Sequence, residues 1–427
     1  MTLRRNIFAN YLGMGAVALA PVLALPWYLS ELGPKQFGLI GFIIMLQAIL
    51  GLLDAGLRQA LVREVAVRFN TSDEGRYRTA SLLLGFERIY WGFALCTGLV
   101  VTLMAGTIAR HWLNLDGLPV TTGQQAVYGA AAIFAAQFPG SIYRSLLVGA
   151  QAHVALNIIM ASGALLRHVG GVAVITAWPA LSAYLIWHAT IALLETLICG
   201  KWAWSLMRVK RSQIKWDTNE WRPIWRLVAG MSGATLLGAL TTQMDRIVLS
   251  RMVDIEQFGY YTIAATVALG SLQLIYPLIQ AVLPVAIQMR NDLAALRSMS
   301  VKLAGLLTLL VGLGILIFAA VGEWLLGIWL RNPEVVAAVY PMLAVLLAGV
   351  VLNAFYNVGY VNWLARQKVH RILQVNTLAV VLSAPLIPLF VSWQGTIGAA
   401  FGWLTINLIG LVFSLEWLQR RSNEKSI

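Results

Sequence analysis

Charged residues are scarce in this sequence. Only 11% of its 427 residues are charged, 59% are hydrophobic, and the mean hydropathy is +0.74. Soluble globular domains carry about 25% charged residues. Because the polar surface is too small to coat a water-soluble particle of this size, most of the chain must face lipid, and a polytopic membrane protein is expected.

Other absences exclude several function classes. The two cysteines, Cys96 and Cys199, lie inside apolar segments, so no disulfide framework or metal site is expected. No GxxxxGK[ST] loop occurs, so the chain is not expected to hydrolyse ATP, and no cofactor is predicted. The longest outer loop, ARHWLNLDGLPVTTGQQ, is too short for a catalytic domain, which argues against an enzyme.

The apolar runs predict an all-α membrane protein with about twelve transmembrane helices. Each run is about 20 residues long, enough to cross a bilayer, and a helix pairs its own backbone groups in lipid. No segment alternates in the manner of a transmembrane barrel. The predicted spans are residues 9–29, 37–57, 86–108, 126–149, 154–177, 181–204, 227–249, 258–286, 302–329, 335–364, 372–391 and 395–417.

The basic residues predict the orientation. With the N-terminus inside, 23 of the 31 lysines and arginines fall in cytoplasmic segments and 4 in outer loops. Lysine and arginine collect on the cytoplasmic side of membrane proteins, so both termini are expected there. The long apolar segment after MTLRRN is expected to stay as the first span and not to be a cleaved signal peptide.

An internal repeat divides the chain. The tripeptide Gln-Phe-Gly occurs at residues 36–38 and again at 257–259, an offset of 221, and residues 59–62 match 280–283 at the same offset. We therefore predict an N-lobe (1–207) and a C-lobe (227–427) of six helices each. The Trp- and Arg-rich segment 208–226 between them is expected to lie on the inner leaflet as a linker. Parallel repeats are typical of transporters that alternate access between two lobes.

Arg167 and Glu195 lie deep in adjacent predicted spans. A charge near the bilayer centre costs at least ~2.5–3.5 kcal/mol, so each needs a partner, water or a function. One interpretation is a structural ion pair between the two helices. The other is that Arg167 binds an anionic head group in a cavity, and both hold if a substrate competes with Glu195 for the arginine.

His188 lies seven residues before Glu195, on the same helical face. A histidine and a carboxylate that line one cavity can carry protons for coupling to an ion gradient. The simpler alternative is a histidine that is hydrogen-bonded to a neighbour. His188 and Glu195 are therefore coupling candidates.

Arg144 lies one to two turns from the cytoplasmic end of its predicted span. It either reaches the interface with its long side chain or contacts substrate at a cavity entrance. Asp245 and Arg246 are adjacent in the seventh span, and side chains of neighbouring helical residues point about 100° apart. One of the two is therefore expected to face the lumen and the other a neighbouring helix. Arg246 is a candidate for substrate binding and Asp245 a candidate for coupling.

Asp54 and Arg58 lie four residues apart in GLLDAGLRQALVREVAVRF. On one helix face they can neutralise each other at the membrane edge, and Glu64 and Arg68 repeat this spacing. At the offset of 221 the second half carries isoleucines in place of Asp54 and Arg58, so the repeated fold alone does not require these charges. Arg58 is therefore a substrate-binding candidate at the cytoplasmic mouth, and Asp54 is a coupling candidate.

Two segments resemble the bacterial polysaccharide exporters, which are O-antigen flippases of the multidrug/oligosaccharidyl-lipid/polysaccharide (MOP) superfamily. LGPKQFGLIGFIIMLQAILGLLDAGLRQALVREVA is similar to the start of that family. TTQMDRIVLSRMVDIEQFGYYTIAATV, with Asp245 and Arg246, is similar to its seventh span and the following loop.

The resemblance implies a MATE-like fold and a function as a flippase. Such a protein moves an undecaprenyl-diphosphate-linked oligosaccharide from the cytoplasmic to the outer leaflet of the bacterial inner membrane. Its expected partners are that lipid-linked sugar, the bilayer, a polysaccharide polymerase and a chain-length regulator, with no nucleic acid.

Two alternatives remain open at this point. A cation-coupled multidrug exporter of the same superfamily would be expected to carry acids in its N-lobe cavity, where this chain carries Arg167. An integral-membrane glycosyltransferase or polysaccharide polymerase would be expected to carry acidic residues on a long outer loop.

Overall fold

The computed structural model describes residues 2–54, 57–69, 72–209, 211–214, 237–238 and 240–418, although the side chains of residues 2–14, 16 and 18 are not described. Within these ranges the chain is almost entirely helical, and β-pairing is confined to one bridge between Asn114 and Asp254. The prediction of an all-α protein is confirmed.

The described helices have the lengths and surfaces of membrane spans. Nine of them are long and apolar enough to cross a bilayer. Leu293–Leu330 has a mean hydropathy of 2.6 over its most apolar window, of which only 6% is buried inside the protein. An apolar surface of this extent is stable only in contact with lipid. The chain is a multi-pass membrane protein.

The spans that the sequence predicts and the helices that the structure contains differ in how they are counted. Helix α1 (Thr2–Gly51) carries the first two predicted spans, which join at Gly33, a residue with non-helical angles (φ 75°, ψ 165°). The predicted span 126–149 is broken into two helices at Pro139, because proline lacks the N–H that continues a helix. The predicted span 227–249 is described only in its last part. The nine helices account for ten predicted spans, because α1 counts as two. The broken span and the partly described span complete the twelve.

The chain forms two compact units. Unit 1 consists of Met1–Leu236 with Asp254–Gly259, and unit 2 of Leu237–Val253 with Tyr260–Ile427. Most of the predicted linker and the first part of the predicted seventh span lie outside the described residues. The boundaries of the two lobes therefore stay predictions.

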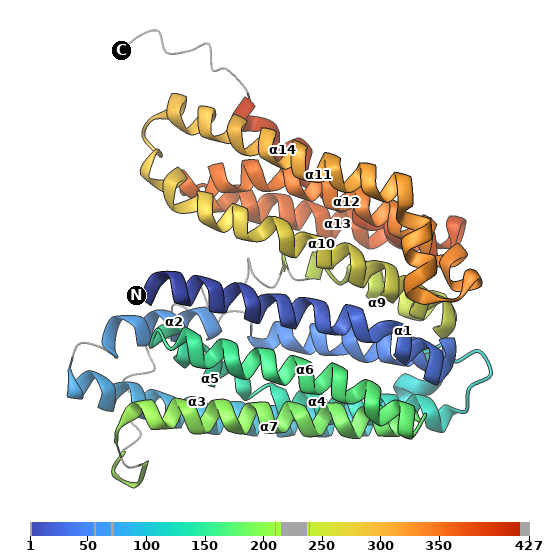
Figure 1. The fold of residues 1–427 in the computed structure, drawn as a ribbon, viewed down its shortest axis with the longest axis horizontal. Helices are drawn as coiled ribbons and strands as arrows, with labels where there is room; N and C mark the ends of the chain where they lie inside the picture. Colours follow the sequence, from blue (N-terminus) through green and yellow to red (C-terminus); the bar gives the residue numbers. More distant parts are fainter. Residues whose placement is uncertain are drawn as a thin grey trace. The chain divides into compact units, whose positions relative to one another are not determined.

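Unit 1 is a bundle in which α6 packs between α1 and α7, while α4 packs on α3 and α7 (Figure 1). Short α5 fits between α2 and α7. The helices after α1 are α2 (Leu57–Arg68), α3 (Asp73–Thr107), α4 (Val120–Gln137), α5 (Gly140–Gly149), α6 (His153–Ala177) and α7 (Leu181–Met207).

Unit 2 is built around α14, which packs on α12 and α13, while α11 packs on α12 (Figure 1). Its helices are α9 (Met244–Met252), α10 (Ile255–Gln288, whose first residues belong to unit 1), α11 (Leu293–Leu330), α12 (Pro333–Ala365), α13 (Val369–Gln394) and α14 (Thr396–Ser414).

The two copies of the Gln-Phe-Gly motif pack directly against each other in unit 1. A Cβ atom built on Gly38 would lie 1.8 Å from the carbonyl oxygen of Ile255, and one built on Gly259 would lie 3.0 Å from the Cα of Gly38. The backbone N–H of Ile255 donates to the carbonyl of Asn114 at 2.9 Å, which holds this segment in place. The motif therefore contains glycine because two backbones meet there without room for a side chain.

Candidate functional site

One buried carboxylate in unit 1 is shared by two arginines from different helices. Glu195 on α7 is 7% exposed and accepts hydrogen bonds from Arg167 on α6 at 2.6 Å and from Arg144 on α5 at 3.3 Å. The side chains of the two arginines are 22% and 25% exposed. The predicted Arg167–Glu195 ion pair is confirmed, and Arg144 joins it.

Glycines make room for this cluster. A Cβ atom built on Gly163 of α6 would lie 2.6 Å from the Oε2 of Glu195. One built on Gly140, the first residue of α5, would lie 2.9 Å from a terminal nitrogen of Arg144. Small residues at such positions let membrane helices approach closely, and here they also leave space for the charged groups.

Arg144 lies just after a proline kink. Helix α4 ends at Gln137 and α5 begins at Gly140, with Pro139 between them. Phe138 and Pro139 keep right-handed helical angles, so the helix is kinked here and does not restart in an unrelated direction. Arg144 lies on the short helix that follows, which packs on α7.

Asp54 and Arg58 belong to the same electrostatic group. Arg58 is exposed on α2 and lies within electrostatic range of both Asp54 and Arg144, and Arg144 lies within range of Arg167. Three cations and two carboxylates leave one excess positive charge if all are ionised. Arg144 and Arg167 contact Glu195 directly, while Arg58 acts on this group only at longer range.

Asp54 and Arg58 do not share one continuous helix face, which the four-residue spacing predicted. Asp54 ends a 3-10 turn (η1, Leu52–Asp54), and a separate helix, α2, begins at Leu57. Asp54 is buried in the core and accepts a hydrogen bond from the hydroxyl of Tyr90 on α3. The analogous pair Glu64–Arg68, which does lie within one helix, is confirmed at 3.0 Å.

His188 lies in an aromatic cluster beside Arg167. Its ring stacks on Tyr184 at 3.9 Å between centroids and lies 5.5 Å from the ring of His168, and Tyr28 donates its hydroxyl to the carbonyl of His168 at 3.1 Å. Among the described residues, three buried nitrogens here have no hydrogen-bond partner: Nε of Arg167, Nδ1 of His168 and Nε2 of His188. Buried polar groups are seldom left unpaired, so this cluster retains capacity for hydrogen bonding.

Asp245 and Arg246 lie in unit 2 and are both buried. Asp245 accepts hydrogen bonds from the hydroxyl of Tyr261 on α10 and from the backbone N–H of Arg246 at 2.8 Å. Asp245 therefore faces a neighbouring helix, as predicted for one of the two. Its carboxylate is held by groups of its own unit.

Tyrosines that bind buried acids are a feature that the sequence did not predict. Three carboxylates inside the helical bundles each accept a hydrogen bond from a tyrosine hydroxyl, and such pairing offsets part of the cost of burying the charge. The pairs are Tyr90 with Asp54, Tyr143 with Glu87, and Tyr261 with Asp245. Tyrosine within an apolar span is the available signal, but it does not identify the acid that the hydroxyl contacts.

Two bundles of membrane-spanning helices, with a charged cluster inside one of them, define a polytopic helical membrane protein. Residues 3–290 match the family model described as polysaccharide biosynthesis protein, and this chain belongs to that family. The resemblance noted in the sequence is confirmed at the level of the family.

The comparisons also extend over nearly the whole chain. The protein is 22% identical to the "Putative O-antigen transporter" of Shigella flexneri over 429 residues, which are 99% of this chain and 98% of that relative. Among solved structures, the lipid II flippase MurJ in an inward closed conformation has a TM-score of 0.72 at 14% identity and covers 96% of this chain and 86% of its own. An inward-facing MATE-family transporter of the MOP superfamily has a TM-score of 0.69 at 15% identity, with coverages of 95% and 97%. The MATE-like fold predicted from the sequence is confirmed.

Proposed function

We propose that this protein is a flippase. It moves a polyprenyl-diphosphate-linked oligosaccharide across the bacterial inner membrane by alternating access, with both termini in the cytoplasm. The observation that carries the proposal is the pair of arginines that share Glu195 within the transmembrane bundle. Membership of the polysaccharide biosynthesis family and the similarity to an O-antigen transporter and to a lipid II flippase support it.

The arginine cluster suits the diphosphate of such a lipid. Guanidinium groups bind phosphate oxygens through two parallel N–H bonds, and these charge-assisted bonds are about twice as strong as neutral ones. Arg144 and Arg167 are each about one quarter exposed, so both are accessible to a ligand. The polyprenyl tail stays in lipid, while the charged head group and sugars pass over the cationic region.

Glu195 acts in this proposal as an internal competitor of the substrate. A buried cation without a partner is strongly destabilising, so the empty protein needs a carboxylate near both arginines. When the diphosphate arrives it takes over the arginines, and when it leaves Glu195 pairs with them again. Glu195 thus limits the affinity for the substrate and favours its release.

Coupling to an ion gradient stays a prediction. A proton on Glu195 would free both arginines for the substrate, which makes this residue the first coupling candidate. His188 lies beside the cluster and is the second, while Asp54 and Asp245 are bound by tyrosines. A polysaccharide polymerase and a chain-length regulator stay predicted partners.

A multidrug exporter is the alternative with the same fold. Cationic drugs are attracted by carboxylates, whereas the group around Glu195 carries more arginines than acids. The cluster therefore favours an anionic substrate. An enzymatic function is disfavoured because the relatives reported above are described as transporters and a flippase.

The test is flipping of a fluorescent lipid-linked oligosaccharide in vesicles that contain the purified protein. We expect Arg167→Gln to lower the initial rate by about 10- to 100-fold, because it removes charge-assisted hydrogen bonds worth about 1.5–3 kcal/mol. Arg110→Gln removes an exposed arginine of the same unit outside the cluster and serves as the matched control. Equal rates for both variants, with both correctly folded, would contradict the proposed site.

A further inference from the structure

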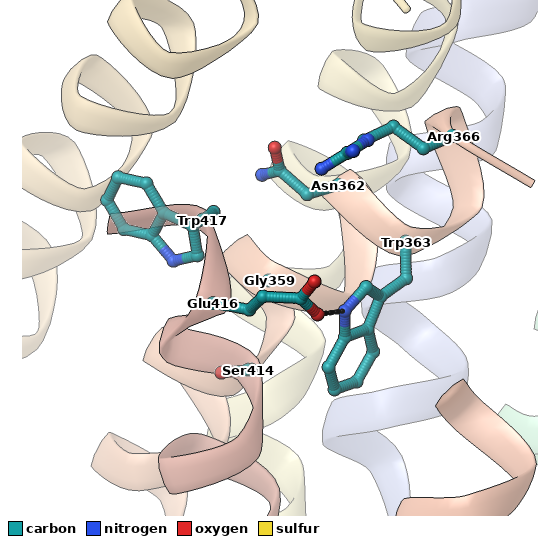
Figure 2. Close-up of a pocket in the computed structure, with 7 residues that line it drawn as sticks. All are labelled: Gly359, Asn362, Trp363, Arg366, Ser414, Glu416 and Trp417. Carbon is teal, nitrogen blue, oxygen red and sulfur yellow. Dashed lines mark hydrogen bonds between the residues drawn. The ribbon is translucent and has the colours of Figure 1, made fainter. Parts of the chain in front are cut away.

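A small open pocket lies at one end of unit 2, where α12 ends and the chain leaves α14. The empty space of about 190 Å³ includes open solvent at its mouth, so this is a shallow hollow at the surface and not an enclosed cavity. Figure 2 shows Glu416 and Trp363 meeting at its centre, with Trp417 on one side and Arg366 on the other. The lining residues are Gly359, Asn362, Trp363, Arg366, Ser414, Glu416 and Trp417.

The single acid of the pocket is already neutralised. Glu416 accepts hydrogen bonds from Lys368 at 2.8 Å and from the indole nitrogen of Trp363 at 3.3 Å, and Arg371 lies 3.9 Å from its Oε2. Arg366 adds a third cation to this end of the unit, where it lines the pocket without pairing with Glu416. The region is therefore cationic, and Glu416 positions two of the cations.

Two hydrogen-bond donors of the pocket lining have no partner. Among the described residues no side-chain partner of the exposed Arg366 occurs, and the Nε1 of Trp417 is buried without a partner. An indole N–H and a guanidinium can only donate hydrogen bonds. The amide of Asn362, by contrast, is already used, since it donates to Ser300 and to the carbonyl of Val358. A ligand that satisfies both free donors must be an acceptor, and the surrounding charge requires an anion.

The backbone presents these groups at the end of the helix. Arg366 caps α12 with its backbone N–H bonded to the carbonyl of Asn362 at 3.1 Å, and Gln367 adopts a positive φ of 56°. This tight turn places Lys368 on Glu416 and leaves Arg366 on the opposite wall. Tryptophan and arginine at the ends of membrane helices occupy the level of lipid head groups.

We propose that this pocket binds the phosphate group of an anionic phospholipid of the surrounding bilayer. Basic pockets between transmembrane helices bind anionic head groups in this way. Exposed apolar side chains continue from the pocket along α14 and the following turn, among them Val412, Phe413 and Leu418, and they can contact the acyl chains. The site lies in unit 2 and does not depend on the flippase proposal.

The test compares lipid retention by the full-length protein in native mass spectrometry after delipidation and titration with phosphatidylglycerol or phosphatidylcholine. We expect the wild type to retain phosphatidylglycerol with about tenfold preference, and Arg366→Gln to lose most of this preference. Trp417→Phe keeps the aromatic ring, removes the donor and should weaken retention as well. Arg331→Gln removes an exposed arginine at the end of another helix of unit 2 and should change nothing.

Inorganic phosphate distinguishes a lipid site from a site for a free anion. We expect phosphate at the lipid concentration to displace little phosphatidylglycerol, because it lacks the acyl chains. Complete displacement by phosphate, equal retention of the two lipids, or equal losses in Arg366→Gln and Arg331→Gln would each overturn the proposal. Circular dichroism on each variant checks that the helices are intact.

Discussion

Replacement of Glu195 by glutamine tests the central ion-pair cluster, because it removes one charge and keeps the shape of the side chain. Glu195 holds Arg167 at 2.6 Å and Arg144 at 3.3 Å. Two unit charges about 4 Å apart attract each other by about 4 kcal/mol at an effective dielectric constant of 20. Loss of one partner of a buried pair costs about 3–5 kcal/mol.

The arginines in this cluster are not fully buried. Because their side chains are 22% and 25% exposed, water can solvate part of the freed charge. We therefore expect Glu195→Gln to lower the free energy of unfolding by about 3 kcal/mol, at the lower end of the range for buried pairs. Thermal unfolding of the purified protein in detergent measures this change.

The same substitution should have opposite effects on binding and transport. Without its competitor, the diphosphate binds the free arginines more tightly, so the affinity for a lipid-linked oligosaccharide rises about tenfold if the competition is worth about 1.4 kcal/mol. Release becomes slower, and the rate of flipping in vesicles falls. Equilibrium binding of the labelled lipid and the flipping rate are measured on the same preparation.

Two control variants show whether the effects are specific to the charge of Glu195. Glu334→Gln removes an exposed carboxylate of unit 2 and should leave stability, binding and transport unchanged. Glu195→Asp keeps the charge on a shorter side chain and should restore part of the transport rate. If Glu195→Gln weakens binding and transport to the same degree, or leaves both unchanged, the role of Glu195 as a competitor is refuted.

Two further predictions concern the packing of unit 1. Gly38→Ala places a methyl group against the carbonyl of Ile255 and should cost about 1–3 kcal/mol of stability, whereas Gly92→Ala on α3 has open space and should cost nothing in a thermal-unfolding assay. Tyr90→Phe leaves the buried Asp54 without its hydroxyl donor and should cost about 1–3 kcal/mol. The cost of Tyr90→Phe should largely vanish in a background with Asp54→Asn, and a full additive cost in that double variant would argue against the hydrogen bond.

The central ion pair of the candidate site could be predicted because a charged residue inside a long apolar run needs a partner. Arg167 and Glu195 each interrupt a long apolar run, and the two runs are neighbours in sequence. An ion pair between adjacent helices is the simplest way to neutralise both charges. Arg144 was predictable as a charge but not as a third member of the cluster. Its contact with Glu195 depends on how α5 packs against α7, which the spacing along the sequence does not specify.

The environment of Asp54 could not be predicted from spacing. The four-residue interval to Arg58 indicates a helical pair only where the helix is continuous, and here a 3-10 turn ends at Asp54. The partner of Asp54 is Tyr90, which lies 36 residues away on α3. A contact at that separation depends on how two helices rotate against each other, and hydrophobic periodicity does not specify the rotation of a helix that is apolar on all sides.

By itself, the amino-acid sequence determined the membrane class, the helical architecture and the repeat, since these follow from apolar length and from the need of each backbone to pair its own polar groups in lipid. The sequence also marked Gln-Phe-Gly as a repeated motif, but only the tertiary structure shows Gly38 and Gly259 in backbone contact. Tertiary structure likewise decided that two arginines share Glu195, and that Arg366 and Trp417 meet at one pocket. These contacts join residues of different helices, and their geometry depends on the packing of side chains between the helices, which local sequence does not encode.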